Sequence, residues 1–290
     1  MYDGVFLSSF GSNVFSTLGV MNTLKSQFSD TVIWNCVGNS SLIIFFKILG
    51  LTLEQTYSRL EDFPLIHSFV NCFSIIPENQ TNKKRYIREW LVDSILETKI
   101  FEEGVKLSEV FKMTNIFPSF LVWSKTNSKP VSINPVSNPN VTLVDAVLAS
   151  LCGVGTYHEH HLEEEVYGCL TGIDTFPLES QFLLENKNNV LKIVNLSYFV
   201  DQLDENFETP MTMIEDELLQ QFLGRNNHTV KQKKDDTTIV VHSDLHRSDL
   251  STGEKKSLYK CGFLQGQNFM NDGSTYGAYR REKSMIRNQD

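Results

Sequence analysis

A strand, a tight turn and a buried helix follow one another directly over residues 32–50, and this succession constrains the fold more than any other part of the sequence. Residues 32–37 form a short apolar run rich in β-branched side chains, which is typical of a buried strand. The turn Gly38-Asn39-Ser40 comes next, and an apolar helix over residues 41–49 ends at Gly50. A strand that feeds directly into a helix predicts an α/β fold with a mostly parallel central sheet.

The rest of the chain continues this alternation. We expect one three-layer α/β/α domain over residues 1–270 and a flexible C-terminal tail over residues 271–290. The predicted strands are 4–8, 32–37, 120–123, 131–133, 190–194 and 238–242, and the predicted helices are 14–28, 41–49, 52–63, 86–97, 107–114, 143–151, 213–222 and 252–269. Residues 78–86 are predicted to be a polar loop.

Charge and cysteine usage exclude several classes of protein. The net charge of -9 over 290 residues disfavours nucleic acid as a partner. The 5 cysteines show no C-x-x-C spacing, which favours reduced, packed thiols. The longest dense apolar stretch is too short to span a bilayer, and the acidic N-terminus lacks the basic region of a signal peptide. We therefore expect a cytoplasmic protein without a transmembrane segment and without a cofactor.

The turn after residue 37 carries the strongest chemical signal. A serine at the apex of a sharp strand-to-helix turn is the layout of a nucleophile elbow, in which the hydroxyl is exposed above a sheet. The elbow pattern G-x-S-x-G is half met here, because Gly38 and Ser40 are present but Leu42 replaces the second glycine. The alternative interpretation is that Ser40 is a turn and helix-cap residue without chemistry.

Over most of its length the sequence resembles the patatin-like phospholipases. The residues that carry the resemblance are Ser9-Phe10-Gly11-Ser12-Asn13-Val14 at the family's glycine loop G-G-G-x-[RK]-G, the following Leu18-Gly19, the elbow Gly38-Asn39-Ser40-Ser41-Leu42, the helix Val144-Asp145-Ala146-Val147-Leu148-Ala149-Ser150 at V-D-A-V-x-A-S, and Phe176-Pro177-Leu178-Glu179 at the end of the D-G-[GA] segment. The resemblance implies a patatin-like fold and a serine–aspartate dyad that cleaves acyl esters.

Mapped onto this chain, the family's machinery is incomplete. Ser40 matches the nucleophile, but the position of the catalytic aspartate falls on or beside Cys169, and no aspartate lies between Asp145 and Asp174. The loop that would donate backbone N–H groups to the oxyanion keeps Gly11 and has Ser9, Phe10 and Val14 where the family has glycine.

These losses favour a protein that does not catalyse. Removing one oxyanion donor costs roughly 10²–10³ in turnover, and losing an activating base costs on the order of 10⁴. We therefore predict a pseudoenzyme that binds lipid or protein or serves as a structural component. The alternative is a weak serine lipid acyl hydrolase of the phospholipase A type that uses Ser40 with a non-standard base.

Three residue groups could stand in for the missing base or act in its place. A histidine of the acidic cluster 157–165 could serve as base, or His158 and His160 could bind a metal with a carboxylate, although a solvated loop explains the cluster as well. Asp174 is the second candidate, and its alternative role is that of a turn residue. The thiol of Cys169 is the third, and its alternative role is that of a packed side chain. No metal site is predicted.

The partners implied are an acyl chain or lipid and, for a non-catalytic domain, a protein. Peripheral contact with a membrane is compatible with this class. The asparagine-, lysine- and phenylalanine-rich composition is typical of AT-rich genomes such as those of large DNA viruses, which leaves a virion component as an alternative location.

Overall fold

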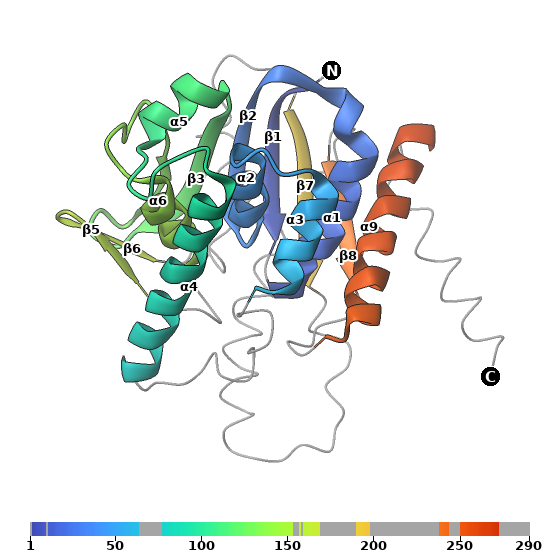
Figure 1. Ribbon diagram of the computed structural model, residues 1–290. Helices are drawn as coiled ribbons and strands as arrows, with labels where there is room; N and C mark the ends of the chain where they lie inside the picture. Colours follow the sequence, from blue (N-terminus) through green and yellow to red (C-terminus); the bar gives the residue numbers. More distant parts are fainter. Residues whose placement is uncertain are drawn as a thin grey trace.

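The computed structural model describes residues 2–9, 11–63, 77–152, 157, 159–168, 190–197, 238–243 and 250–272. The chain opens with strand β1 (Tyr2–Ser9), the 3-10 turn η1 (Gly11–Asn13), helix α1 (Val14–Leu24), the 3-10 turn η2 (Lys25–Gln27), strand β2 (Phe28–Gly38) and helix α2 (Ser40–Ile48). Later elements are α3 (Leu53–Glu61), α4 (Pro77–Thr98), α5 (Leu107–Thr114), β3 (Phe117–Ser124), β4 (Lys129–Ile133), α6 (Leu143–Leu151), β5 (His160–Leu162), β6 (Glu165–Gly168), β7 (Val190–Ser197), β8 (Thr238–Ser243) and α9 (Thr252–Asp272) (Figure 1).

These strands form one mixed, mostly parallel sheet. Its order is β5-β6-β3-β2-β1-β7-β8, with β4 also paired to β3. The five neighbouring strands β3, β2, β1, β7 and β8 are parallel. The pairs of β3 with β4, β3 with β6 and β5 with β6 are antiparallel. The chain leaves β1 towards β2 first and reaches its other neighbour β7 much later, so β1 is the point at which the strand order reverses. Ligands of open α/β sheets bind beyond the carboxyl ends of the strands at such a point.

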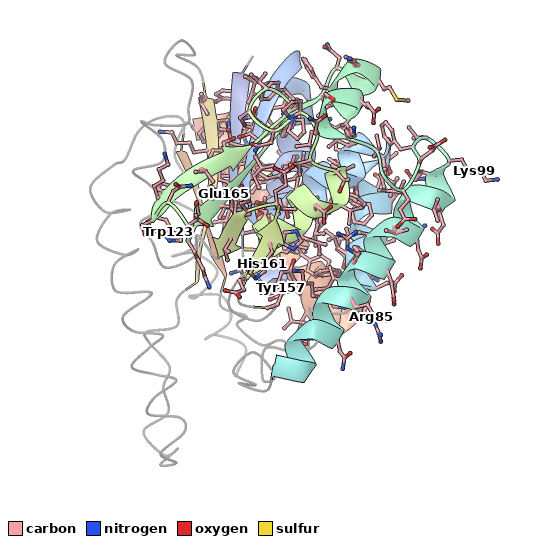
Figure 2. The ribbon with its side chains drawn as sticks, turned by 90° about the vertical axis from the view of Figure 1, so that its left-hand side faces the viewer. Arg85, Lys99, Trp123, Tyr157, His161 and Glu165 are labelled. Atoms are coloured by element: carbon pink, nitrogen blue, oxygen red, sulfur yellow. The ribbon has the colours of Figure 1, made fainter. Side chains whose placement is uncertain are left out.

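The described helices that cover the sheet pack on one another in a single layer. Helices α1, α2 and α3 stand in front of the strands in Figure 1, α9 lies beside α1, and α6 packs on β2 and β3. The view in Figure 2 places the helices to one side of the sheet. A central sheet covered by a layer of helices confirms the predicted α/β class. A second helical layer on the other face stays a prediction, because the described residues do not test it.

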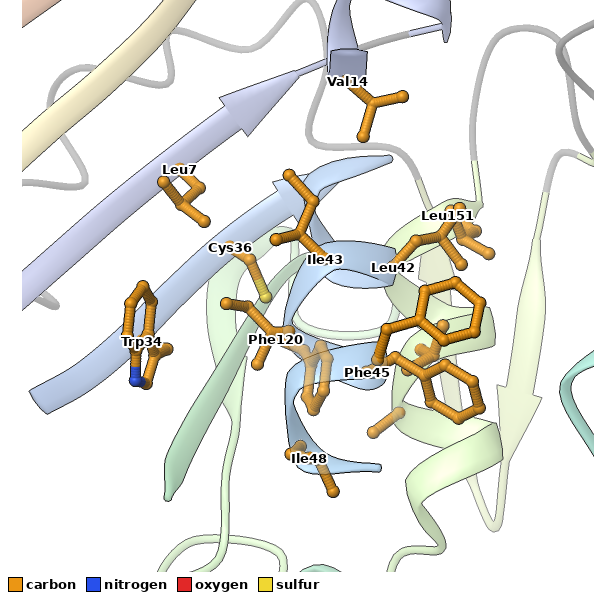
Figure 3. Packing of buried hydrophobic residues seen from close by; sticks show 14 of the residues in the cluster. Leu7, Val14, Trp34, Cys36, Leu42, Ile43, Phe45, Ile48, Phe120 and Leu151 are labelled. Carbon is orange, nitrogen blue, oxygen red and sulfur yellow. The ribbon is translucent and has the colours of Figure 1, made fainter. Parts of the chain in front are cut away.

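Helix α2 is the centre of the core. Its residues 40–46 are all buried, which is expected of a helix that is apolar on every side. In Figure 3 the side chains of Leu42, Ile43 and Phe45 lie among Cys36 of β2, Phe120 of β3 and Leu151 of α6. The turn before α2 is therefore held between a packed helix and the middle of the sheet.

The structure corrects one predicted element, and two predicted segments lie outside the described residues. Residues 78–86, predicted as a loop, form the first turns of α4, so that prediction is wrong; Glu, Gln, Lys and Arg are good helix formers and Pro77 stands at the first helical position, where proline is favoured. The predicted helix 213–222 and residues 273–290 of the predicted tail lie outside the described residues. Within the described ranges, no helix is both long and apolar enough to cross a bilayer.

Glycines bring α1 and α9 into backbone contact, although about 240 residues separate the two helices in the chain. A Cβ atom on Gly262 would lie 1.9 Å from the carbonyl oxygen of Ser16, and one on Gly19 would lie 2.1 Å from that of Tyr259. The Thr23 hydroxyl donates a hydrogen bond across the same contact to the Phe263 carbonyl, at 3.0 Å. The helices can approach this closely only because glycine stands at these positions.

Replacing Gly262 with alanine should therefore destabilise the domain. The new methyl group would collide with backbone that has no rotamer to change, and overpacking of this kind costs about 1–3 kcal/mol or more. The control is Gly253→Ala in the same helix, where the nearest atom to an added Cβ is 3.9 Å away. In urea unfolding we expect a lower midpoint for Gly262→Ala and an equal or higher one for Gly253→Ala; equal midpoints for the two variants would contradict the close contact.

Candidate functional site

The predicted elbow lies at the carboxyl edge of the two central strands. Strand β2 ends at Gly38 beside Ser9, the last residue of β1, and α2 begins two residues later at Ser40. Gly38 has a φ of +64°, in the left-handed region that glycine adopts without strain. The backbone N–H of Asn39 donates to the Ser9 carbonyl at 2.9 Å, which fastens the turn to β1.

The Ser40 hydroxyl points into this turn. The residue has no exposed surface, and its Oγ lies 2.8 Å from the carbonyl oxygen of Leu7 and 2.7 Å from that of Val37. The same Oγ accepts from the backbone N–H of Val37 at 3.2 Å. The hydroxyl therefore links the start of α2 to both central strands, and its proton faces two backbone acceptors.

A nucleophile elbow requires the opposite arrangement. There the reactive residue occupies the strained turn position and exposes its hydroxyl above the sheet. In this turn the left-handed φ belongs to Gly38, whereas Asn39 has a φ of -66° and Ser40 is the first residue of the helix. The strained apex is thus occupied by a residue without a side chain, and the serine lies two residues further on.

The other predicted elbow residues are also packed. The Ser41 hydroxyl donates to the Gly38 carbonyl at 2.7 Å, and Leu42 is fully buried beside Leu151 (Figure 3). Asn39 is 8% exposed.

The described part of the predicted oxyanion loop is equally closed. Ser9 is fully buried at the end of β1, and Gly11 and Ser12 form the 3-10 turn η1, in which Ser12 is 8% exposed. In an elbow the N–H of the residue after the nucleophile is one of the oxyanion donors. The N–H of Asn39, which follows the residue at the apex, is already bonded to the Ser9 carbonyl. Phe10 lies outside the described residues.

The position at which the family resemblance places the base is not described. Cys169 and Asp174 both lie outside the described residues, so the predicted proximity of Cys169 to Ser40 stays a prediction. Among the residues that the structure describes, no carboxylate hydrogen-bonds to the Ser40 hydroxyl.

Removing the Ser40 hydroxyl should lower stability, because the carbonyls of Leu7 and Val37 would lose a buried donor. A buried hydrogen-bonding group left without its partner costs about 1–3 kcal/mol. Thermal or urea unfolding of Ser40→Ala should show this loss, with the exposed Ser26→Ala as the matched control. Identical stability of both variants and the parent would show that the hydroxyl is not held as described.

A second polar cluster joins α4, α6 and β5. The Asp145 carboxylate pairs with Arg88, accepts from the Thr142 hydroxyl at 2.7 Å and lies 3.5 Å from Nε2 of His160. His160 has only 2% of its side chain exposed, so the interpretation of the whole 157–165 cluster as a solvated loop is wrong for this residue. The residue is buried because β5 pairs with β6 at the edge of the sheet and turns the ring inward against α6.

The contacts of His160 and its neighbours do not lead to Ser40. Among its described contacts, His160 faces Asp145, and the exposed His161 lies 3.2 Å from Glu159. Tyr157 donates its hydroxyl to the Leu148 carbonyl and lies on the same side of the molecule as His161 in Figure 2. His158 lies outside the described residues. Within the described ranges, no group of three side chains is placed to hold a metal ion.

The environment of this cluster shifts two titrations. Desolvation lowers the pKa of His160, against the opposing effect of Asp145. Burial on its own would raise the pKa of Asp145, but the contacts with His160 and Thr142 and the charge of Arg88 bring it below its ordinary value. As the pH falls, His160 therefore stays neutral, and Asp145 stays charged, to a lower pH in the folded protein than in the unfolded chain.

The sign of the pH dependence follows from these shifts. When the pH falls through the ordinary histidine pKa of about 6.5, the unfolded chain binds a proton at residue 160 before the folded protein does, so stability decreases. We expect His160→Gln to flatten the decrease of the unfolding free energy between neutral pH and pH of about 5.5. A parental slope in His160→Gln would contradict the assignment.

Sequence reasoning missed two features. It treated Asp145 as a motif residue and did not pair it with Arg88 and His160; the only available signal was the Thr142-x-x-Asp145 capping pattern. It also missed a cavity of about 540 Å³ between α1, α2 and α3 at the opposite edge of the sheet. No local motif marks this cavity, because its wall residues come from five separate segments.

Solved structures with the same fold are known. The structure matches VipD from Legionella pneumophila over 94% of this chain and 67% of that chain, with a TM-score of 0.53 and 11% identity. It matches ExoU of the heterodimeric ExoU-SpcU complex, from the type III secretion system of Pseudomonas aeruginosa, over 94% of this chain and 52% of that chain, with a TM-score of 0.52 and 11% identity. The present chain thus spans about half the length of the ExoU chain. No protein-family model and no curated protein matches the sequence.

An identity of 11% shows the fold and nothing finer. The chain has the α/β fold, with a mixed and mostly parallel sheet, of the patatin domains of VipD and ExoU. This confirms the fold that the sequence resemblance implied.

Proposed function

We propose that this patatin-fold domain is a pseudoenzyme, which keeps the phospholipase framework for binding and does not hydrolyse acyl esters. The observation that carries the proposal is the direction of the Ser40 hydroxyl. It is fully buried and bonded to backbone atoms of both central strands, while the strained apex of the turn is Gly38.

Catalysis by Ser40 would require this arrangement to be undone. To attack an acyl carbon, Oγ would have to leave two carbonyl acceptors and the Val37 N–H and move out of a closed site. The carbonyls would lose a buried donor, at a cost of about 1–3 kcal/mol, before any chemistry began. Among the described residues, no basic side chain hydrogen-bonds to the Ser40 hydroxyl. A serine hydroxyl without a base is a weak nucleophile.

The competing function is weak acyl hydrolysis by Ser40, and one specific observation favours it. The strand–turn–helix backbone is retained, with Ser40 at the N-terminal end of a helix, and this end carries the partial positive charge that stabilises an anion. A base supplied by residues around position 169 would complete such a site. The two functions differ in whether Ser40 is needed for turnover.

A turnover assay separates them. Purified protein should hydrolyse short-chain nitrophenyl esters and phospholipid vesicles no faster than Ser40→Ala, and a fluorophosphonate probe should not label residue 40. Ser41→Ala is the matched control, since Ser41 is equally buried at the same turn, and circular dichroism verifies that each variant is folded. Hydrolysis or labelling that disappears in Ser40→Ala and persists in Ser41→Ala would establish the enzyme and reject our proposal.

A domain that does not catalyse can act through a binding partner. ExoU, of similar fold, has been solved as a heterodimer with SpcU. We propose by this analogy that a protein is a partner of the present chain, with an acyl chain or lipid as the second class of ligand that the fold suits.

A further inference from the structure

A cavity lies at the edge of the sheet opposite the elbow. Its volume is about 540 Å³, within the roughly 300–1,000 Å³ that small-molecule sites occupy. It is bounded by the end of α1, by Phe28 and Trp34 of β2, by Ile43 and Lys47 of α2, by the start of α3 and by the residue before β3. Helix α2 rises 1.5 Å per residue, so its lining residue Lys47 is about 10 Å along the helix from Ser40.

The inner walls are apolar and partly aromatic. Trp34 and Phe28 of β2 pack edge to face with ring centroids 5.2 Å apart, and Ile43 and Leu51 add aliphatic surface. Walls of this kind hold the hydrocarbon or ring portion of a ligand.

The polar part of the lining is positive. The Lys47 ammonium lies 5.0 Å from the centroid of the Trp34 ring, and Lys25, the first residue of η2, is a second lining cation. Glu54 is the lining carboxylate, so two cations face one anion in a protein whose net charge is -9. Within the described residues, Lys47 forms no ion pair.

The start of α3 adds donors to the same wall. Thr52 and Gln55 cap each other's backbone N–H groups, and Thr56 donates to the Thr52 carbonyl. Leu53 and Glu54 line the cavity at the first helical positions, where N–H groups have no partner within a helix and the helix dipole is positive. A bound anion would satisfy donors and cations from α2 and α3 together.

We propose that this cavity binds a small anionic amphiphile, with its apolar part against Trp34 and its carboxylate or phosphate group beside Lys47. The Lys47 side chain is exposed, so its ammonium is accessible to an anion that enters from solvent. The inference does not depend on the proposed function, because it uses no residue of the elbow and holds whether or not Ser40 is reactive.

The charge requirement can be tested with ligands of one chain length. Octanoate, octyl phosphate, octanol and octylammonium are titrated into the full chain, with binding followed by calorimetry and by tryptophan fluorescence. We expect both anions to bind more tightly than octanol and octylammonium, and the ranking of octanoate against octyl phosphate distinguishes a carboxylate ligand from a phosphate ligand. Absence of binding by both anions, or equal binding of octanol, would overturn the proposal.

Variants at Lys47 test the location. Lys47→Met keeps the length of the side chain and removes its charge, so it should weaken the better anion roughly tenfold, or about 1.4 kcal/mol, and leave octanol unchanged. Lys47→Arg should retain binding, and the exposed Lys112→Met on α5 is the matched control. Equal weakening in Lys112→Met, or parental affinity in Lys47→Met, would reject this site. Ser40→Ala should bind as the parent does, which keeps the result separate from the turnover assay.

Discussion

The hydroxyl of Ser40 links the start of α2 to the two strands at the centre of the sheet, and the rest of the core is arranged around this link. It fixes where α2 begins, and α2 then packs its buried residues 42–46 in contact with β2, β1 and α6. A serine in this position stabilises the fold through backbone acceptors. The same contacts remove the hydroxyl from solvent.

Local patterns in the sequence were enough to predict most of the fold. The strand, turn and helix around residue 38 and the helix 143–151 are continuous apolar segments with clear ends, so their own residues define them. The first turns of α4 were missed because their residues are polar on every side and carry no periodic signal. The burial of His160 was missed because its partners Asp145 and Arg88 are distant in the chain, and only tertiary pairing brings them together.

The candidate site was predictable in position and not in geometry. A partial match to G-x-S-x-G locates the turn after β2 in the sequence. It does not determine which residue of the turn takes the left-handed φ. Glycine adopts that conformation without steric cost, so a turn that contains Gly38 can satisfy its geometry there and leave Ser40 inside the helix. The base position at Cys169 stays a prediction from the family resemblance.

The glycine contact between α1 and α9 also has a consequence for how the chain reaches this structure. The face of α1 that carries Gly19 obtains its partner only when residues 259–266 are present, and β1 obtains its second neighbour β7 only after residue 190. Contacts across such long stretches of chain raise the contact order, which slows folding and leaves apolar surface uncovered for longer. During synthesis, the first strand and helix therefore wait for almost the whole described chain before their packing is complete.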